Sequence, residues 1–279
     1  MKIYGVVVLY NPDENVLNNI FSYIDDIDKL YVIDNSEVYN NNLIQKLQND
    51  LKVQYIDNKG NRGIAYALNL GAKLAIDDNI DWLLTMDQDS GFDKGSLEKM
   101  ITWSIENQTE TIGIISPMHS RGTQNNYQRH LDLVTMTSGN LLNLEIFQKI
   151  EGFDEKLFID SVDTEYCLRL NLNGYYMKRF KEIVLKHNLG DTERKKFLFF
   201  TFSVTKHNAT RRYYITRNRL YVRKRYEEYF HWYFKYDIKR TLKDIIKILL
   251  AEDDKILKLK MIIQGYMDYK KGKFGKLDV

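Results

Sequence analysis

Two aspartates one residue apart, Asp87 and Asp89, lie in "LLTMDQDSG" (83–91), directly after an apolar run typical of a buried strand. Two carboxylates this close repel each other by roughly 1 kcal/mol in water, and by more where solvent is excluded. A bound divalent cation would offset that repulsion, because such cations prefer oxygen ligands. The alternative is a solvated acidic turn. A second Asp-x-Asp, in the polar stretch 25–29, shows that the spacing alone does not identify a metal site.

A second group of acidic residues surrounds a predicted helix start in "LFIDSVDTEYCLRLNLNG" (157–174). Asp163 is a good N-cap residue there, and that structural role alone would account for it. A catalytic carboxylate also suits this position, because a helix N-terminus is exposed and positively polarised. Glu165 follows two residues later. His187 ends the apolar run of "VLKHNLGD" (184–191), where a lone histidine is more often a satisfied core residue than a ligand.

Glycines gather in "NKGNRGIAYALNLG" (58–71), where a predicted strand meets a predicted helix. This arrangement presents backbone N–H groups to an anion such as a phosphate. The stretch matches neither the Walker pattern nor G-x-G-x-x-G. Taken alone, it is therefore equally well explained as a turn that caps a helix.

The elements that must position these residues alternate along the first half of the chain. Strands are predicted at 3–10, 30–34, 53–57, 82–86 and 112–116, and helical periodicity at 13–27, 41–50, 63–78 and 95–107. This alternation predicts an α/β fold with a mostly parallel sheet and helices on both faces. Ligands of such sheets bind beyond the carboxyl ends of the strands. Polar pairs lie at four of those ends: Tyr10-Asn11, Asp34-Asn35, Asp57-Asn58 and Asp87-Asp89.

The pattern changes after residue 117. Residues 119–130 are predicted to form a loop, followed by a strand over 134–144 that Gly139 interrupts, a helix over 163–173 and a strand over 182–187. From about residue 208 the chain is predicted to be mostly helical. An amphipathic stripe there consists of Leu242, Ile245, Ile246, Leu249 and Leu250.

Composition limits the class of protein. A chain of 279 residues buries a full core, as one large domain or as a domain with an appendage. The single cysteine, Cys167, excludes a disulfide framework and a cysteine-based zinc site, and it predicts a reducing compartment. The N-terminus shows no signal-peptide pattern, and no apolar run approaches the ~20 residues of a membrane span. We therefore expect a cytoplasmic location.

Charge is distributed unevenly along the chain. Residues 1–193 carry 18 Lys+Arg and 29 Asp+Glu, a net charge of −11, whereas residues 194–279 carry 23 and 9, a net charge of +14. A basic, aromatic tail on an acidic body predicts contact with an anionic surface, such as the inner face of the cell membrane. The alternative is an ordinary helical appendage with a solvated face.

The order of these motifs resembles that of family 2 glycosyltransferases, and more narrowly their bacterial dTDP-rhamnosyltransferase branch. The resemblance covers roughly residues 3–225. It depends on "DQDS", "EGFDEKLFIDSVDTEYCLR" and "RRYYITRNR" occurring in this order. It implies a GT-A fold, a nucleotide-sugar donor, a divalent metal (Mg²⁺ or Mn²⁺) and inversion at the anomeric carbon.

The resemblance also implies a role for individual residues. Nucleotide binding falls to Tyr10, Asn11, Asp34, Asn58, Gly63, Asn69 and Asp87. Metal binding falls to Asp87, Asp89 and His187. Asp163 matches the general base, with Glu165 as the fallback. The sugar and acceptor pocket would take Ser138, Gly139, Asn140, Arg211 and Arg212.

Two departures from the family pattern affect this expectation. Gly91 follows the Asp-Gln-Asp-Ser motif without the proline common just beyond it, so the local turn can differ, and the stretch 119–132 is short on the acceptor side. The expected domains are a catalytic domain over 1–207, with a nucleotide-sugar half over 1–117 and an acceptor half over 118–207, and a basic helical region over 208–279.

The expected activity is transfer of L-rhamnose from dTDP-β-L-rhamnose to a hydroxyl of a growing surface polysaccharide or lipid-linked oligosaccharide. Alternative donors are UDP-galactofuranose, UDP-glucose and UDP-galactose. A different class, a nucleic-acid-binding module using the basic tail, leaves the acidic strand ends without a role. A homodimer and peripheral membrane contact through the tail are further expectations, and nucleic acid is not an expected partner.

Overall fold

The computed structural model of the chain describes residues 2–107, 109–119, 133–187, 192–197, 200–205 and 207–277, with the backbone alone for His187, 192–197 and 200–205. The chain forms two compact units. The first consists of Met1–Glu155 and Val162–Asn188, and the second of Lys156–Ser161 and Leu189–Val279. The short segment 156–161 thus belongs with the C-terminal residues, although it lies within the sequence of the first unit.

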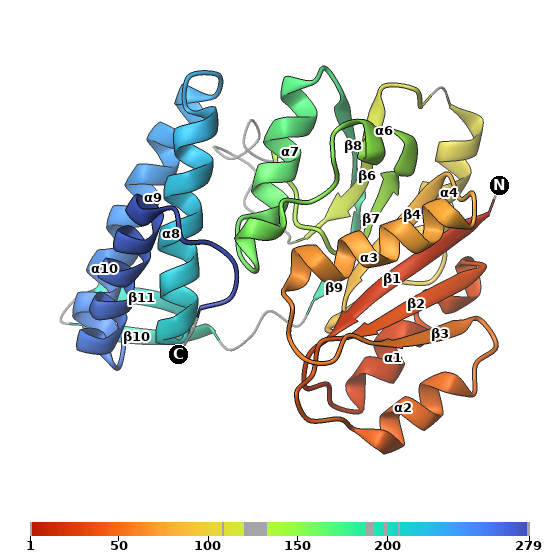
Figure 1. The fold of residues 1–279 in the computed structure, drawn as a ribbon, viewed down its shortest axis with the longest axis horizontal. Coiled ribbons are helices and arrows are strands. Elements are labelled where there is room, and N and C mark those ends of the chain that lie inside the picture. The colour runs from red at the N-terminus through yellow and green to blue at the C-terminus, as the bar shows by residue number, and fades with distance from the viewer. Residues whose placement is uncertain are drawn as a thin grey trace. The chain divides into compact units, whose positions relative to one another are not determined.

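A seven-stranded sheet forms the centre of the first unit (Figure 1). Its order is β3-β2-β1-β4-β7-β6-β8. Only β7 runs antiparallel to its neighbours, so the prediction of a mostly parallel sheet is confirmed. The strands are β1 (Ile3–Leu9), β2 (Lys29–Asp34), β3 (Val53–Asp57), β4 (Trp82–Asp87), β6 (Ile112–Met118), β7 (Asn140–Asn143) and β8 (Tyr176–Val184).

Helices cover both faces of this sheet. The central strand β1 is apolar on both sides, so each of its faces packs against helices. Val7 belongs to the core cluster that also holds residues of α1, α2 and α4. On the other face Val6 lies against α3, where an added Cβ at Gly71 would come within 2.5 Å of the valine side chain. The helical elements are α1 (Asn15–Phe21), η1 (Ile24–Asp26), α2 (Asn41–Gln48), α3 (Ile64–Asp77), α4 (Ser96–Glu106), α6 (Leu144–Lys149), η2 (Glu155–Leu157) and α7 (Val162–Leu172).

The region after residue 117 differs from the prediction in detail. The strand expected over 134–144 is restricted to β7, because Gly139 has a φ of +79° and cannot continue an extended strand. The strand expected over 182–187 is divided into the end of β8 and the two-residue β9 (Lys186–His187). Residues 120–132 of the predicted loop and its neighbours lie outside the described residues.

The second unit contains α8 (Ala209–Tyr226), α9 (His231–Ala251), α10 (Lys255–Lys271) and the hairpin of β10 (Thr192–Phe197) and β11 (Phe200–Thr205). The three helices lie side by side in Figure 1, and α8 packs closely on α10. Gly265 permits that approach, since a Cβ there would lie 2.6 Å from the carbonyl oxygen of Tyr213. Among the described residues, no helix combines the length and the apolar composition of a membrane span.

Candidate active site at the strand ends

Asp34 ends β2 and is almost completely buried, at 1% exposure. The hydroxyl of Tyr55 on β3 donates to its Oδ2 at 2.8 Å, and the backbone N–H of Ser36 donates to its Oδ1 at 2.8 Å. Burial and this hydrogen bond raise the pKa of Tyr55, so the phenol stays a donor. Asp34 is therefore held in one orientation at the sheet edge.

A chain of amides connects the end of β3 with the start of α3. Asn58 donates from Nδ2 to Oδ1 of Asn35 at 2.6 Å, and Asn35 donates in turn to the carbonyl oxygen of Gly63 at 3.2 Å. Gly63 is the N-cap of α3, and its φ of +91° explains why glycine is required there. The predicted Asn58 and Gly63 thus lie together at the N-terminus of a long helix, where a diphosphate is favoured.

The end of β1 is connected to the aspartate turn through Gln88. The Gln88 side chain accepts from the backbone N–H of Tyr10 at 2.8 Å and donates to the Tyr10 carbonyl oxygen at 3.2 Å. The Tyr10 side chain is exposed, at 44%, and so is available for stacking on a base. Asn11 has a φ of +46°, and its N–H donates to Ser36 Oγ at 2.8 Å.

The turn that carries Asp87 and Asp89 is fixed from several sides. Asn19 of α1 donates to the Gln88 carbonyl oxygen at 2.8 Å, and the N–H of Asp87 donates to Ser138 Oγ at 3.0 Å. The next residues form β5 (Ser90–Gly91), which pairs antiparallel with β9 so that Ser90 lies opposite His187.

The turn also explains why glycine occupies position 91. A Cβ at Gly91 would lie 2.8 Å from Ser22 Oγ, which accepts a hydrogen bond from the N–H of Phe92 at 3.0 Å. A small residue thus lets the turn lie close to α1, in the place where the family pattern departs from this sequence. Residues 186–187 and the aspartate turn are paired across a distance of about a hundred residues in the chain.

The residues of this turn fit a divalent metal. Among the described residues, no group of three or more His, Cys, Asp and Glu side chains lies close enough together to enclose an ion. Mg²⁺ and similar ions do not require such a cage, because they are usually held by one or two carboxylates together with water and substrate phosphates. Asp87 and Asp89, both partly exposed at the sheet edge, provide that donor set. The backbone of His187 pairs with Ser90, next to Asp89. The structure describes only the backbone of His187.

The stretch Ser138–Asn140 leads into β7, which pairs with β4 beside the site. Ser138 and Asn140 are buried, at 0% and 2% exposure. Gly139 has its positive φ where a Cβ would lie about 3 Å from Pro117 and Leu185, so the backbone is closely packed there. Asn140 donates to the Met136 carbonyl oxygen at 2.6 Å, while its buried Oδ1 has no hydrogen-bond partner in the described part of the chain.

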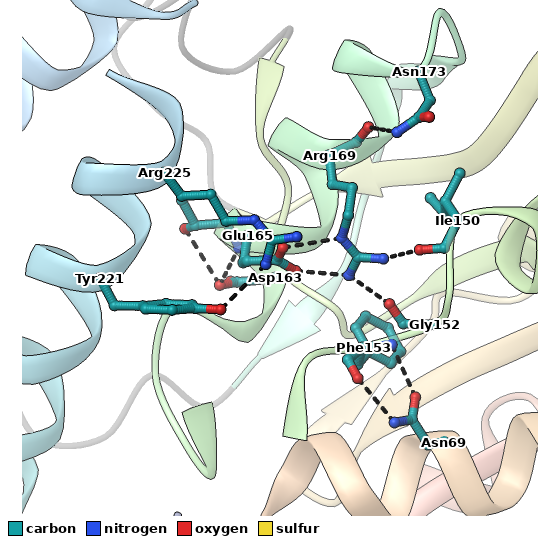
Figure 2. A network of polar contacts seen from close by, with 11 residues as sticks. Asn69, Ile150, Gly152, Phe153, Asp163, Glu165, Arg169, Asn173, Tyr221 and Arg225 are labelled. Atoms are coloured by element: carbon teal, nitrogen blue, oxygen red, sulfur yellow. Dashed lines mark hydrogen bonds and ion pairs between the residues drawn. The ribbon is translucent and has the colours of Figure 1, made fainter. Parts of the chain in front are cut away.

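The two acidic residues of α7 have different surroundings. Helix α7 begins at Val162, so Asp163 lies within the first turn, and its Oδ1 accepts from the Thr164 N–H at 2.7 Å. Glu165 is completely buried, and Arg169 donates to both of its oxygens, at 2.9 and 2.7 Å. Figure 2 shows this pair and the bonds of Arg169 to the carbonyl oxygens of Ile150 and Gly152. The surroundings of Glu165 favour a structural role, and Asp163 is the more accessible carboxylate.

Asn69, expected beside the diphosphate, makes hydrogen bonds to other residues of the protein. Its Nδ2 donates to the Phe153 carbonyl oxygen at 2.9 Å, and its Oδ1 accepts from the Phe153 N–H (Figure 2). Nδ2 also donates to Glu155 Oε1 at 2.9 Å. These contacts connect α3 to the loop before η2. In this arrangement Asn69 fixes that loop, and any contact with a diphosphate would be additional.

Arg211 and Arg212, expected in the acceptor pocket, both lie in the second unit. Arg211 is half-exposed and pairs with Asp160 of the same unit at 3.1 Å. Arg212 is buried and pairs at 2.5 Å with Glu252, which also receives Lys258 at 2.9 Å. The buried group of Arg212, Glu252 and Lys258 thus connects α8 with the segment between α9 and α10.

Sequence reasoning did not assign roles to two residues that support the site, Gln88 and Tyr55. Gln88 stands inside the quoted motif, yet nothing in the spacing shows that it bonds to β1. The contact of Tyr55 with Asp34 follows from strand register, which a single sequence does not give.

Comparisons with known proteins agree with this architecture. The model of the family described as glycosyl transferase family 2 matches residues 6–166. The chain is 28% identical over 239 residues to dTDP-rhamnosyl transferase RfbF of Shigella flexneri, an alignment that covers 78% of each chain. Two solved structures are similar at 13% identity. S. aureus TarS in complex with UDP-GlcNAc has a TM-score of 0.55 and is matched over 98% of this chain and 73% of its own. GalNAc-T7 with UDP, GalNAc and Mn²⁺ has a TM-score of 0.60, with 98% and 57% covered.

The mostly parallel sheet with its flanking helices has the GT-A fold, which the similar solved structures share. The family model matches more than half of the chain, so the chain belongs to glycosyl transferase family 2. Within that family it is similar to a dTDP-rhamnosyl transferase.

Proposed function

We propose that this chain is an inverting, metal-dependent rhamnosyltransferase that uses dTDP-β-L-rhamnose as its donor. The observation that supports the transfer chemistry is the meeting of Asp87 and Asp89 with the other polar strand ends at one edge of the sheet. The proposal of rhamnose depends on the similarity to RfbF together with the motif order. The acceptor is a hydroxyl of a growing surface polysaccharide or lipid-linked oligosaccharide.

The chain's own residues divide the work as follows. Tyr10, Asn11, Asp34 and Asn58 bind the nucleoside, and the N-terminus of α3 at Gly63 faces the diphosphate. Asp87 and Asp89, with His187 as a further ligand, would hold Mg²⁺ or Mn²⁺. When bound, that ion supplies positive charge against the negative charge that develops on the leaving diphosphate.

Asp163 serves as the general base in this proposal. It accepts the proton of the acceptor hydroxyl as that oxygen forms a bond to the anomeric carbon. The bond between the anomeric carbon and the diphosphate oxygen breaks, and its electron pair leaves with dTDP. A positioned base of this kind contributes typically 10²–10⁴-fold to a rate. Attack from the side opposite the leaving group accounts for inversion.

A donor screen tests the proposal. The full chain is incubated with Mn²⁺ or Mg²⁺ and, separately, with dTDP-β-L-rhamnose, UDP-galactofuranose, UDP-glucose and UDP-galactose, and release of the nucleoside diphosphate is measured. We expect metal-dependent release of dTDP, with Asp87→Asn as the inactive control. Preferential release of UDP would replace the donor and keep the enzyme class, and no release from any donor would contradict the proposed reaction.

Membrane contact through the second unit is part of the same proposal. On α9, Leu242, Ile246 and Leu249, three residues of the amphipathic stripe, are exposed, at 56%, 50% and 47%. Basic neighbours accompany them: Lys239, Arg240, Lys243 and Lys247. An apolar stripe bordered by basic residues suits the surface of an anionic membrane, where a lipid-linked acceptor would be found.

A further inference from the structure

The segment Lys156–Ser161 leads directly into α7 and has an unusual backbone. Phe158, Asp160 and Ser161 have φ values of +58°, +64° and +65°. Residues with a Cβ disfavour this left-handed region, so each of the three is strained relative to an extended or helical conformation. Such a segment keeps its shape only if contacts from elsewhere hold it.

Asn218 of α8 provides the central contact. Its side chain is completely buried, and Nδ2 donates to the carbonyl oxygens of Leu157, Ile159 and Asp160 at 2.7, 2.7 and 2.9 Å. One amide group thus holds three carbonyl oxygens of the strained segment. Oδ1 accepts from Nε of Arg217 at 3.0 Å, which fixes the orientation of the amide.

Arg217 extends the same contact toward the start of the segment. It is 1% exposed and donates to the carbonyl oxygens of Lys156, at 3.3 Å, and of Gly275, at 2.9 Å. The Gly275 N–H also donates to the Lys156 carbonyl oxygen at 3.0 Å. Gly275 therefore also contacts the start of the segment.

Two side chains of the segment are held as well. The Phe158 ring stacks on Tyr214 of α8 with centroids 5.2 Å apart. Asp160 accepts from Arg211, with contacts of 3.1 to 3.2 Å. The Arg-Asn pair of the 211–219 motif and its aromatic neighbours thus all contact this one segment. None of them was given a positioning role by the sequence.

We propose that Asn218, oriented by Arg217, is a positioning residue for Asp163. The carboxylate lies two residues after Ser161, in the first turn of α7, so the conformation of the segment sets where that turn begins. This inference depends on the proposed function, in which Asp163 is the base. Displacement of a reacting group by about 1 Å can cost ~10²-fold in rate, so a loosened segment would lower turnover without removing any substrate contact.

The test compares three variants of the full chain. Asn218→Asp keeps the size and the acceptor for Arg217, and it sets a carboxylate against three carbonyl oxygens. Asn218→Ser is the milder change and keeps one hydroxyl donor, so it remains informative if the first variant folds poorly. Val222→Ala is the matched control, because Val222 is buried in the same helix and has no polar atom to give the segment.

Two measurements are made on each variant. Hydrogen–deuterium exchange should rise in peptides covering 156–163 for both Asn218 variants, and not for Val222→Ala. In Asn218→Asp, kcat should fall at least about tenfold, while KM for the donor and the Kd for dTDP with Mn²⁺ stay within about twofold, because donor binding does not use the segment. Asn218→Ser should lie between this variant and the wild type.

A second substitution provides a rescue. Ser161→Gly removes a Cβ from a position with φ of +65°, so the segment needs less support to adopt its native shape. Added to Asn218→Asp, it should recover part of the lost kcat. The kcat is calculated per folded protein, measured by circular dichroism on the same samples, so that a change in the amount of folded protein is not counted as a change in turnover.

The outcomes separate the inference from the proposed function. Faster exchange in 156–163 with unchanged kcat would show that the segment does not position the base, and unchanged exchange would show that Asn218 does not hold it. Either result overturns the inference. Failure of the proposed function appears instead in the wild type, as the absence of transfer from every donor, or in Asp163→Asn, as full activity.

Discussion

Asp163 and Glu165 lie two residues apart on α7, and their contacts separate their roles. Asp163 makes a local bond to the Thr164 N–H and remains partly exposed. Glu165 has both oxygens bonded to Arg169 and no exposed surface. A base must reach a substrate hydroxyl, and only a carboxylate with exposed surface can do so without prior rearrangement.

Replacing Asp163 by Asn should stop transfer without unfolding the protein. Asn keeps an oxygen for the Thr164 N–H but cannot take up the hydroxyl proton. We expect a melting temperature within a few degrees of wild type, unchanged dTDP binding, and a transfer rate lower by at least ~10²-fold. The transfer rate is measured in an activity assay, and the melting temperature and dTDP binding are measured by calorimetry on the same samples. An active Asp163→Asn beside an inactive, well-folded Glu165→Gln would assign the base to Glu165.

The metal proposal makes a prediction about binding as well as rate. Asp89→Ala should abolish activity and should also remove the enhancement of dTDP affinity by Mn²⁺, because the carboxylates would hold the ion that supplies positive charge to the diphosphate. His187→Ala should have the weaker effect. Isothermal titration with dTDP, with and without Mn²⁺, measures this directly. Full activity of the wild type in excess chelator would remove the metal role from Asp87 and Asp89 together.

At the scale of the element, α7 is held by a buried ion pair. The Glu165–Arg169 pair has side chains 0% and 11% exposed. A pair with the same spacing, Glu145–Lys149 on α6, has side chains 74% and 54% exposed. The two pairs have similar distances, of 2.7 and 2.6 Å, so they differ mainly in burial.

Removing the acidic partner should therefore have unequal effects on stability. Glu165→Ala leaves the Arg169 charge buried without its partner and should lower the free energy of unfolding by about 3–5 kcal/mol. Glu145→Ala, the matched control, should change it by no more than about 0.5 kcal/mol. Urea unfolding at pH 7 measures both. Equal effects would mean that burial does not determine the strength of the α7 pair.

Cys167, the single cysteine, reports on opening of the same helix. Burial raises the pKa of its thiol to about 12, and the thiol lies 3.8 Å from the Thr135 carbonyl oxygen. At pH 8 the thiolate fraction would then be on the order of 10⁻⁴, and the sulfur is shielded. We expect no reaction with Ellman's reagent in the native state and one thiol titrated in urea. Rapid native labelling would indicate frequent opening of α7.

At the scale of the whole molecule, the two units differ in charge and in surface. The acidic residues that form the strand-end site are in the first unit, and the exposed apolar stripe with its basic neighbours is in the second. In the proposed function, the donor site therefore belongs to the first unit and the surface for membrane contact to the second. The stripe can be altered without substituting residues of the donor site.

Membrane attachment should follow from the stripe and its charges. The protein should float with anionic liposomes at low salt and less at high salt, since each basic residue near the surface contributes about 1 kcal/mol. Ile246→Glu with Leu249→Glu should abolish flotation and leave donor hydrolysis intact. Leu51→Glu is the control, because Leu51 is fully exposed in the first unit. If the wild type does not float at either salt, the stripe serves another contact, such as a second copy, which sedimentation equilibrium would show.

The amino-acid sequence by itself determined the local elements and the strand-end polar residues. Strands predicted at 30–34 and 53–57 begin and end within one residue of β2 and β3, and the helices at 63–78 and 95–107 differ by a residue from α3 and α4. These elements follow from short-range periodicity and capping, which a single sequence contains. The parallel order then places their carboxyl ends at one edge without further information.

The tertiary structure alone decided which distant residues meet. Antiparallel insertion of β7 between β4 and β6, the pairing of Ser90 with His187, and the burial of Glu165 against Arg169 depend on register and packing. The contact of Asn218 with the segment before α7 joins residues about sixty positions apart. Such contacts are set by the global minimum of packing and hydrogen bonding rather than by local preference, so periodicity and spacing do not reveal them.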